Sequence, residues 1–220
     1  MADTPAITAR ALSMRGPDGP IYGPVDLEVP ADGVTVLRHP PGEGRTALLL
    51  TLAGRMRPSG GELSVFGRTR ATDIFGLAAV AGFDGVDDLV EAVTVADVLA
   101  EQKAWTSPWY RPVGRIGADD LAAVCEPVFG ELPTPAPGTY VEELGELDRL
   151  LLRIALAATA RPQLLVVGTV DAVTSDADRK LLAERLLALG ERRTVLTSSA
   201  NDAAALGLRT VAVPESKGGE

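Results

Sequence analysis

The sequence predicts an α/β protein, and three observations carry this prediction. The apolar run Val34–Leu37 is typical of a buried strand, and a turn rich in proline and glycine follows it. From Thr46 the chain passes into the apolar segment ALLLTLAG, which is long enough for a helix that Gly54 would end. Further apolar strands are expected at residues 77–83, 162–167 and 194–199, with a strongly apolar helix at 150–160.

The order of strand, glycine-rich turn and helix favours phosphate binding. The backbone N–H groups of such a turn point inward, and the helix N-terminus adds a partial positive charge. The P-loop pattern G-x-x-x-x-G-K-[ST] aligns here with His39, Pro40, Pro41, Gly42, Glu43, Gly44, Arg45 and Thr46. The second glycine and the threonine are present, whereas a histidine replaces the first glycine and an arginine the lysine. A plain turn between a strand and a helix is the alternative interpretation.

The elements around this turn follow from local patterns. Residues 6–14 and 25–29 are predicted to be short strands on either side of a turn rich in glycine and proline, and an alternating strand ends near Gly67. Thr94 and Asp97 have the spacing of a capping box at the start of a helix. From there to about residue 140 the pattern indicates helices broken by proline and glycine.

The residues after the turn carry a family resemblance. Leu52-Ala53-Gly54, the segment PSGGE at 58–62 and the strand that ends near Gly67 stand at the offsets seen in ATP-binding cassette (ABC) ATPases. The chain resembles this family of transporter subunits over nearly its whole length. The resemblance implies one domain over 1–220: a P-loop NTPase core at 1–93 and 141–213, a helical subdomain at 94–140 and a frayed tail at 214–220. It also implies a mixed sheet flanked by helices, with an antiparallel N-terminal part.

Several positions depart from the family's motifs in the second half of the chain. The signature loop L-S-G-G-Q corresponds to Leu144–Asp148, which is LGELD here. The family ends its Walker B strand with Asp-Glu, and Gly168 and Thr169 stand at those places. Asp171, slightly farther on, would substitute only if the strand end were remodelled.

Three single positions of the family's site also differ. Asp84 or Gly85 stands where a glutamine senses the γ-phosphate and Mg²⁺, and Ala200 stands where the switch histidine is expected. The aromatic residue that stacks on adenine is expected near Gly16. Tyr22 comes several residues later, where a strand-edge tyrosine is the favoured alternative.

These losses affect catalysis more than binding. A positioned general base contributes about 10²- to 10⁴-fold, and each electrostatic stabiliser a comparable factor. We therefore assign no catalytic residue and expect hydrolysis to be weak or absent. Arg45 is a permanent cation that can hold phosphate oxygens, and Thr46 offers a hydroxyl to Mg²⁺. Weak binding of ATP and Mg²⁺ through residues 39–46 is the resulting expectation.

Three functional hypotheses follow from the resemblance. The first is a transporter-type subunit that binds ATP, hydrolyses it poorly and works with a membrane-spanning subunit or a second cassette, as a homodimer or heterodimer. The second is a pseudo-ATPase scaffold or regulatory protein that binds no nucleotide. The third is an active ATPase that uses substitutes such as Asp171 and Arg45.

The composition limits the classes of partner and the cell compartment that we expect for this chain. The net charge of −9 argues against nucleic acid or an anionic membrane as a direct partner. Residues 1–16 lack the pattern of a signal peptide, and no apolar run approaches the roughly 18 residues that span a bilayer. Cys125 is the sole cysteine, which fits a reducing compartment. We expect a cytoplasmic protein, held at the inner face of the membrane only through a partner.

Outside the motifs, the chain has one short segment rich in aromatic residues. Both tryptophans, Trp105 and Trp109, stand with Tyr110 in a short stretch around Pro108. Aromatic side chains on a loop are typical of interface anchors. The alternative is that these rings fold inward and fill a small helical core.

Overall fold

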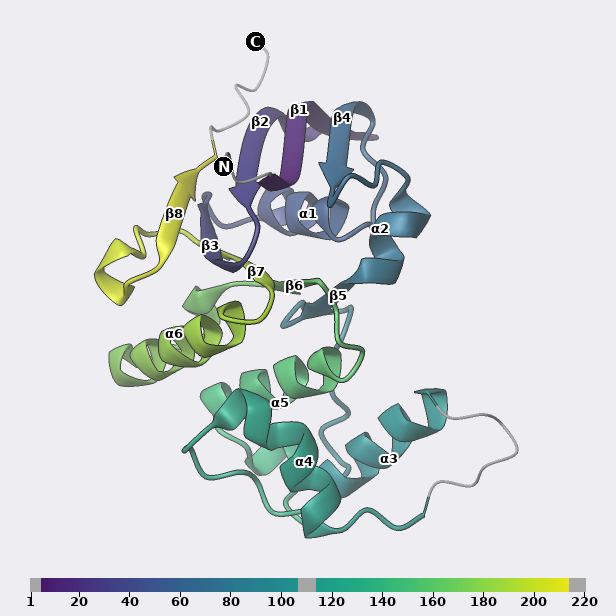
Figure 1. The fold of residues 1–220 in the computed structure, drawn as a ribbon, viewed down its shortest axis with the longest axis vertical. Helices are drawn as coiled ribbons and strands as arrows, with labels where there is room; N and C mark the ends of the chain where they lie inside the picture. Colours follow the sequence, from purple (N-terminus) through teal and green to yellow (C-terminus); the bar gives the residue numbers. More distant parts are fainter. Residues whose placement is uncertain (1–4, 107–113, 214–220) are drawn as a thin grey trace.

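The computed structural model describes residues 5–106 and 114–213, and it shows strands and helices in layers (Figure 1). Its strands are β1 Pro5–Gly16, β2 Gly19–Pro30, β3 Gly33–Arg38, β4 Gly60–Val65, β5 Ala78–Ala81, β6 Leu164–Val167, β7 Thr194–Ser199 and β8 Arg209–Ala212. A parallel sheet has the order β5-β6-β7-β3-β8, and an antiparallel sheet has the order β2-β1-β4. The predicted α/β fold with an antiparallel N-terminal part is confirmed.

The helices alternate with the strands of the parallel sheet. They are α1 Glu43–Leu52, α2 Ala71–Leu77, α3 Val95–Thr106, α4 Ala118–Phe129, α5 Glu146–Ala158 and α6 Asp176–Gly190, with short 3₁₀ turns at Val141–Glu143, Val170–Ala172 and Ala204–Leu206. The sequence did not indicate α2 or β8, because elements of seven and four residues are too short for a periodic signal. Helix α5 also begins earlier than the predicted residue 150.

Helix α1 lies between the two sheets, which is why its segment is apolar on nearly all sides (Figure 1). Its leucines pack with the inner faces of β1, β2 and β4 in one buried cluster. The parallel strands are buried on both faces: Leu164 and Val166 of β6 belong to this cluster, whereas Leu165 and Val167 belong to a second cluster under α5 and α6. This two-sided burial explains the continuous apolar runs in the sequence.

The second cluster continues from the parallel sheet into the helices at the bottom of Figure 1. It joins Val36 of β3 and Val195 of β7 to Cys125 and Phe129 of α4. Burial raises the pKa of the Cys125 thiol to about 11, so this cysteine is an unreactive core residue. The division of the chain at residues 94–140 stays a prediction.

The start of α3 confirms the predicted capping box. The Asp97 carboxylate accepts hydrogen bonds from the backbone N–H and the hydroxyl of Thr94, at 3.0 and 2.6 Å, and the Thr94 hydroxyl accepts one from the Asp97 N–H. The hydrogen bonds from Thr94 lower the pKa of the Asp97 carboxyl. Aspartate therefore performs the role that glutamate usually has in this motif.

An arginine of α5 holds the loop that leaves β5. Arg153 donates through Nε and a terminal nitrogen to both oxygens of Asp87, at 2.9 and 2.8 Å. The same carboxylate accepts the backbone N–H groups of Gly82 and Phe83 at 2.8 and 2.7 Å. Arg153 is only 11% exposed, so this pair is shielded from water. Through Asp87, the first part of the loop is thereby fastened to α5.

Replacing Arg153 by alanine should lower the free energy of unfolding by about 2–3 kcal/mol. The change removes a charged hydrogen-bond pair from a shielded site and leaves Asp87 with its two backbone donors. Urea denaturation of the purified chain would measure the change. The matched control is Arg10→Ala, because Arg10 and its partner Glu28 are 68% and 65% exposed and such pairs contribute at most about 1 kcal/mol. Equal effects of the two substitutions would contradict this account.

Candidate functional site

The segment from His39 to Gly42 joins β3 to α1 at the carboxyl edge of the parallel sheet. The backbone N–H of His39 donates to the Ser199 carbonyl oxygen at 3.1 Å, which continues the pairing of β3 with β7. The His39 side chain turns back on its own loop, with Nδ1 2.9 Å from the carbonyl oxygen of Pro40. Pro40 and Pro41 are exposed. The predicted turn is therefore formed, and its histidine points to the loop itself.

Two glycines give the P-loop its backbone path. Gly42 immediately precedes α1 with a φ of 141°, a conformation that side chains disfavour. Gly44 lies in the first turn of α1, against β2, and a Cβ atom there would lie 2.4 Å from the carbonyl oxygen of Ile21. A larger residue would push the helix away from the antiparallel sheet. Gly44, the glycine that remains from the pattern, and Gly42 thus both have structural reasons to be glycine.

The cation of the P-loop has a partner within the chain. Arg45 places a terminal nitrogen 3.4 Å from Oδ2 of Asp171, with the two side chains 14% and 27% exposed. Asp171 lies in the 3₁₀ turn Val170–Ala172 after β6. Sequence reasoning named both residues but did not foresee that they meet, because 125 intervening residues separate two strand ends that only the sheet brings together.

Further contacts hold the Asp171 carboxylate in place. Oδ1 accepts the hydroxyl proton of Ser199 at 2.8 Å, and Oδ2 accepts the backbone N–H of Ala200 at 2.7 Å. The Asp171 N–H donates to the hydroxyl of Thr169 at 3.2 Å. One carboxylate thus ties the ends of β6 and β7 to the first turn of α1. Ala200, at the place of the switch histidine, contributes only a backbone donor.

The Walker B position has no room for a side chain. A Cβ atom on Gly168 would lie 2.1 Å from the carbonyl oxygen of Gly82 after β5. The Gly168 N–H donates to the Ala81 carbonyl oxygen at 2.9 Å, and its own carbonyl oxygen accepts the Ser198 hydroxyl. An aspartate at this place would require β5 and β6 to separate. The next residue, Thr169, donates its hydroxyl to the Ser198 carbonyl oxygen at 3.0 Å.

The segment at the signature position also carries a carboxylate with an internal partner. Gly145 precedes α5, and Glu146 in its first turn accepts the backbone N–H and the hydroxyl of Thr174 at 2.8 and 3.1 Å. These hydrogen bonds, the backbone one first, lower the pKa of the Glu146 carboxyl. Leu147, in place of the second glycine, is buried. The first turn of this helix therefore presents a negative charge where the family presents small residues.

The remaining predicted site residues lie at the surface, with one exception. Glu43 and Thr46 in the first turn of α1 are exposed, as are Asp84 and Gly85 in the loop after β5. In the described parts of the chain, no group of three or more histidine, cysteine, aspartate or glutamate side chains could hold a metal ion. The role of Thr46 as a Mg²⁺ ligand stays a prediction.

The exception is Tyr22, which is 2% exposed. Its hydroxyl donates to the Thr51 hydroxyl at 2.9 Å, and Thr51 in turn donates to the Ala47 carbonyl oxygen of α1. Burial raises the pKa of this tyrosine. Tyr22 therefore belongs to the core beneath α1, and its ring is not at the surface where adenine could stack on it.

No family model matches this chain. It is 29% identical over 171 residues to a protein of Streptomyces avermitilis named as an ABC transporter ATP-binding protein, covering 76% of this chain and 28% of that protein. It is 35% identical over 65 residues to the cytochrome c biogenesis ATP-binding export protein CcmA of Xanthomonas campestris pv. campestris, covering 30% of each. The matches span less than a third of the length of these curated relatives.

Solved structures agree with these sequence relatives in fold. The chain matches cbiO1 of Clostridium perfringens, described as part of the ABC transporter complex cbiONQ, with a TM-score of 0.75 at 12% identity, over 95% of this chain and 84% of that one. An ABC transporter ATP-binding protein of Pyrococcus furiosus matches with a TM-score of 0.69 at 18% identity, over 94% and 96%. The sequence relatives and the shared fold together confirm the predicted resemblance of the chain to ATP-binding subunits of ABC transporters.

Proposed function

We propose that this chain is a cassette subunit that binds ATP and Mg²⁺ weakly, hydrolyses ATP slowly or not at all, and acts with a partner subunit. The observation that carries the proposal is the ion pair between Arg45 and Asp171. Arg45 is the sole cation of the P-loop, and a phosphate that enters the loop must take it from Asp171. Nucleotide binding is therefore a competition between two anions for one guanidinium.

Electrostatics makes this competition unfavourable for the nucleotide. Two unit charges 4 Å apart interact by about 4 kcal/mol at an effective dielectric constant of 20. An entering phosphate gains such an attraction to Arg45 but meets the charge of Asp171, which Ser199 and Ala200 hold in place. Backbone donors before α1 and the helix N-terminus still favour an anion. Weak binding is the balance of these terms.

The chemical step lacks its usual groups. Gly168 and Thr169 supply neither a metal-binding carboxylate nor a general base, and Ala200 supplies no side-chain donor. ATP and Mg²⁺ would meet only the P-loop backbone, Arg45 and the Thr46 hydroxyl. These groups can hold phosphate and one metal ligand position, but they offer no group to activate water.

A scaffold that binds no nucleotide is the second candidate function. Contacts within the chain favour the scaffold, because Arg45 is paired with Asp171 and Glu146 accepts a hydrogen bond from Thr174. In a homodimer of the family type, each composite site would pair this P-loop with this altered signature segment. No such site would then present the full set of phosphate contacts.

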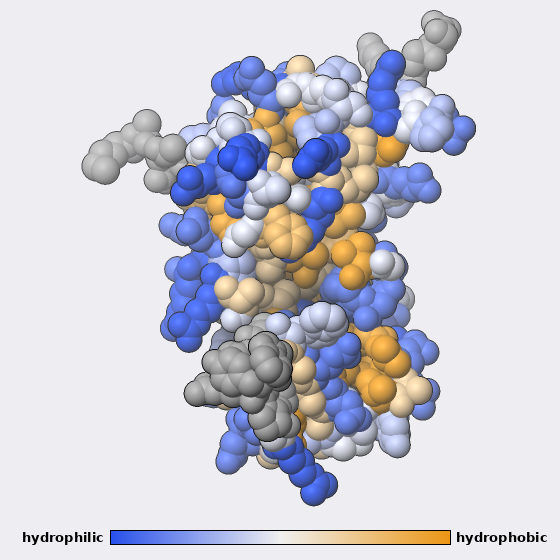
Figure 2. All heavy atoms as spheres, turned by 90° about the vertical axis from the view of Figure 1, so that its right-hand side faces the viewer, coloured by the Kyte–Doolittle hydropathy of each residue, from blue (hydrophilic) through white to orange (hydrophobic). Residues whose placement is uncertain are grey.

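A groove on the side of the molecule is evidence for the proposed partner subunit. It has a volume of about 380 Å³ and lies between β5, α3, α5 and the loop after β5, with Arg55, Val98, Trp105 and Leu156 among its lining residues. Trp105 is 81% exposed, and Phe75 and Val90 are also exposed large apolar residues. Figure 2 shows apolar side chains reaching the surface on this side of the molecule. Trp109 and Tyr110 lie outside the described residues, so the predicted aromatic cluster is seen only in Trp105.

In the described part of the chain, no helix combines the length and apolarity that crossing a membrane requires. With a net charge of −9, the surface is also unsuited to anionic lipid. We infer that a membrane-spanning or second cassette subunit contacts this groove, and that the exposed indole of Trp105 anchors it.

Calorimetric titration with ATP tests the proposed binding. With Mg²⁺ present we expect saturable binding with a dissociation constant on the order of millimolar. Arg45→Ala should abolish the binding because no other P-loop cation remains. Phosphate release should stay at the level of the Arg45→Ala variant. Absence of any heat would favour the scaffold, and turnover above that level would contradict the assignment of no catalytic residue.

Replacing Asp171 by asparagine should strengthen ATP binding by about tenfold or more, which corresponds to about 1.4 kcal/mol. The change removes the competing charge at nearly constant shape and frees Arg45. The same titration measures the effect. Asp119→Asn, which removes an exposed aspartate of α4, is the control with the same change of net charge. Unchanged or weaker binding by the Asp171 variant, with that control at the wild-type value, would contradict the competition.

Replacing Trp105 by alanine should weaken association with the partner and leave the fold intact. Because the side chain is 81% exposed, the free energy of unfolding should change by less than about 0.5 kcal/mol. Thermal unfolding measures this, and the fraction of the chain that sediments with membranes from its native cells measures association. Leu187→Ala, at a 39% exposed leucine of α6, serves as the control. Loss of folding, or an unchanged membrane fraction, would count against the anchor.

A further inference from the structure

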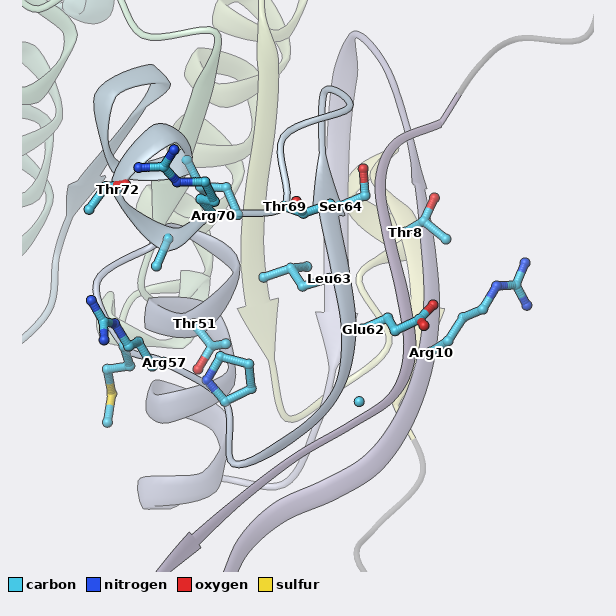
Figure 3. A pocket seen from close by; sticks show the side chains of 15 residues that line it. Thr8, Arg10, Thr51, Arg57, Glu62, Leu63, Ser64, Thr69, Arg70 and Thr72 are labelled. Carbon is cyan, nitrogen blue, oxygen red and sulfur yellow. The ribbon is translucent and has the colours of Figure 1, made fainter.

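A second and larger groove runs along β4, on the antiparallel sheet (Figure 3). Its volume is about 870 Å³, and its walls come from β1, β4, the segment after α1 and the start of α2. None of its residues belongs to the P-loop or to the groove beside Trp105. The function proposed above leaves this groove unused.

The backbone of β4 faces this groove with an unpaired edge. In the order β2-β1-β4 of the described strands, β4 pairs on one side only. The Phe66 N–H donates to the Ala6 carbonyl oxygen, and the register pairs Thr8 with Ser64. Since hydrogen-bonded positions alternate along an antiparallel pair, Leu63 turns its N–H and C=O away from β1 and toward the groove.

One residue of this edge already forms an antiparallel bridge with a later residue of the same chain. At the next outward-facing position, Val65 exchanges hydrogen bonds with Arg68 in both directions, at 2.8 and 2.9 Å. These two residues form an antiparallel bridge. The edge is therefore paired for one residue by the chain's own turn and then continues past Leu63 without a described strand beside it.

The side chains around the edge give the groove its chemistry. Leu63 and Ile74 are apolar lining residues. Arg57 and Arg70 stand on the side of α1 and α2 (Figure 3). Both arginines are exposed, and only Arg70 has a described carboxylate partner, Asp73 at 3.8 Å. Arg10 and Glu62 lie on the opposite side (Figure 3), where Arg10 pairs with Glu28 at 3.6 Å. Arg57 is therefore the lining arginine for which the described residues offer no carboxylate partner, and it gives its side of the groove a local positive charge.

We propose that the groove binds an extended peptide segment of a partner protein, rich in acidic side chains, as an added strand on the edge of β4. The Leu63 N–H and C=O supply main-chain recognition, and Arg57 and Arg70 select acidic side chains. A second copy of this chain is disfavoured as the occupant, because it would bring another set of arginines to the same place. The binding is independent of nucleotide, so it goes beyond the function proposed above.

Fluorescence anisotropy with a labelled octapeptide of alternating valine and glutamate tests the proposal. The peptide is titrated with the whole chain in the absence of nucleotide. We expect saturable binding, no binding of the matching valine–lysine peptide, and binding at least about tenfold weaker when every backbone nitrogen of the acidic peptide is methylated. Equal binding of the methylated peptide would overturn strand addition, and no binding at millimolar peptide would overturn the proposal as a whole.

Substitutions in the chain locate the binding. Leu63→Pro removes an N–H that faces outward, and an edge strand tolerates proline at such a position. This substitution should weaken binding of the acidic peptide by about tenfold. Arg57→Ala together with Arg70→Ala should do the same, whereas Arg192→Ala after α6 should have no effect. If Arg192→Ala weakened peptide binding equally, the binding would be nonspecific charge attraction, and the proposed site would be overturned.

Two other occupants are separate outcomes of the same design. Competition by inorganic phosphate at equal concentration would indicate a simple anion site and overturn a peptide ligand. A dimer of the chain alone that Leu63→Pro dissolves, seen by analytical ultracentrifugation, would assign the edge to a second copy and overturn the partner peptide.

Discussion

The P-loop end of the molecule depends on one carboxylate. Asp171 receives Arg45 from α1, the Ser199 hydroxyl and the Ala200 N–H from the end of β7, and it lies in the turn that follows β6. These segments meet only because the parallel sheet places its carboxyl ends along one edge. A partly buried cation without this partner would have to be paired with something else or leave the loop. The ion pair therefore explains how an arginine is accommodated in the first turn of α1, after the turn that leaves β3.

Two other loops at this end are closed in the same manner. Glu146 binds the segment before α6 through Thr174, and Asp87 binds Arg153 and two backbone N–H groups after β5. In each case a carboxylate of the chain takes hydrogen-bond donors that would otherwise be free for a ligand or a second subunit. Charged hydrogen bonds of this kind are among the stronger local ones. These loops are thus fastened to neighbouring segments of the chain.

Local patterns predicted most of the fold, and tertiary contacts account for the rest. The strand before the P-loop, the helix ended by Gly54 and the box of Thr94 and Asp97 each follow from neighbouring residues. The burial of Tyr22 could not be predicted from its neighbours in the sequence, because it depends on α1 packing above it. The pairing of Arg45 with Asp171 likewise required the sheet order, which no single segment contains. Motif comparison located the positions at which the chain departs from the family pattern, but not the contacts that the residues at those positions make.

The buried core of the fold lies mainly outside the motif positions. The two buried clusters consist mostly of strand and helix side chains, and few motif positions contribute to them. Gly168 is itself part of the packing, because its lack of a side chain lets β6 approach the carbonyl oxygen of Gly82 after β5. An aspartate at this position would force those backbones apart. A single substitution at Gly168 would therefore not add a carboxylate here without moving β5 and β6.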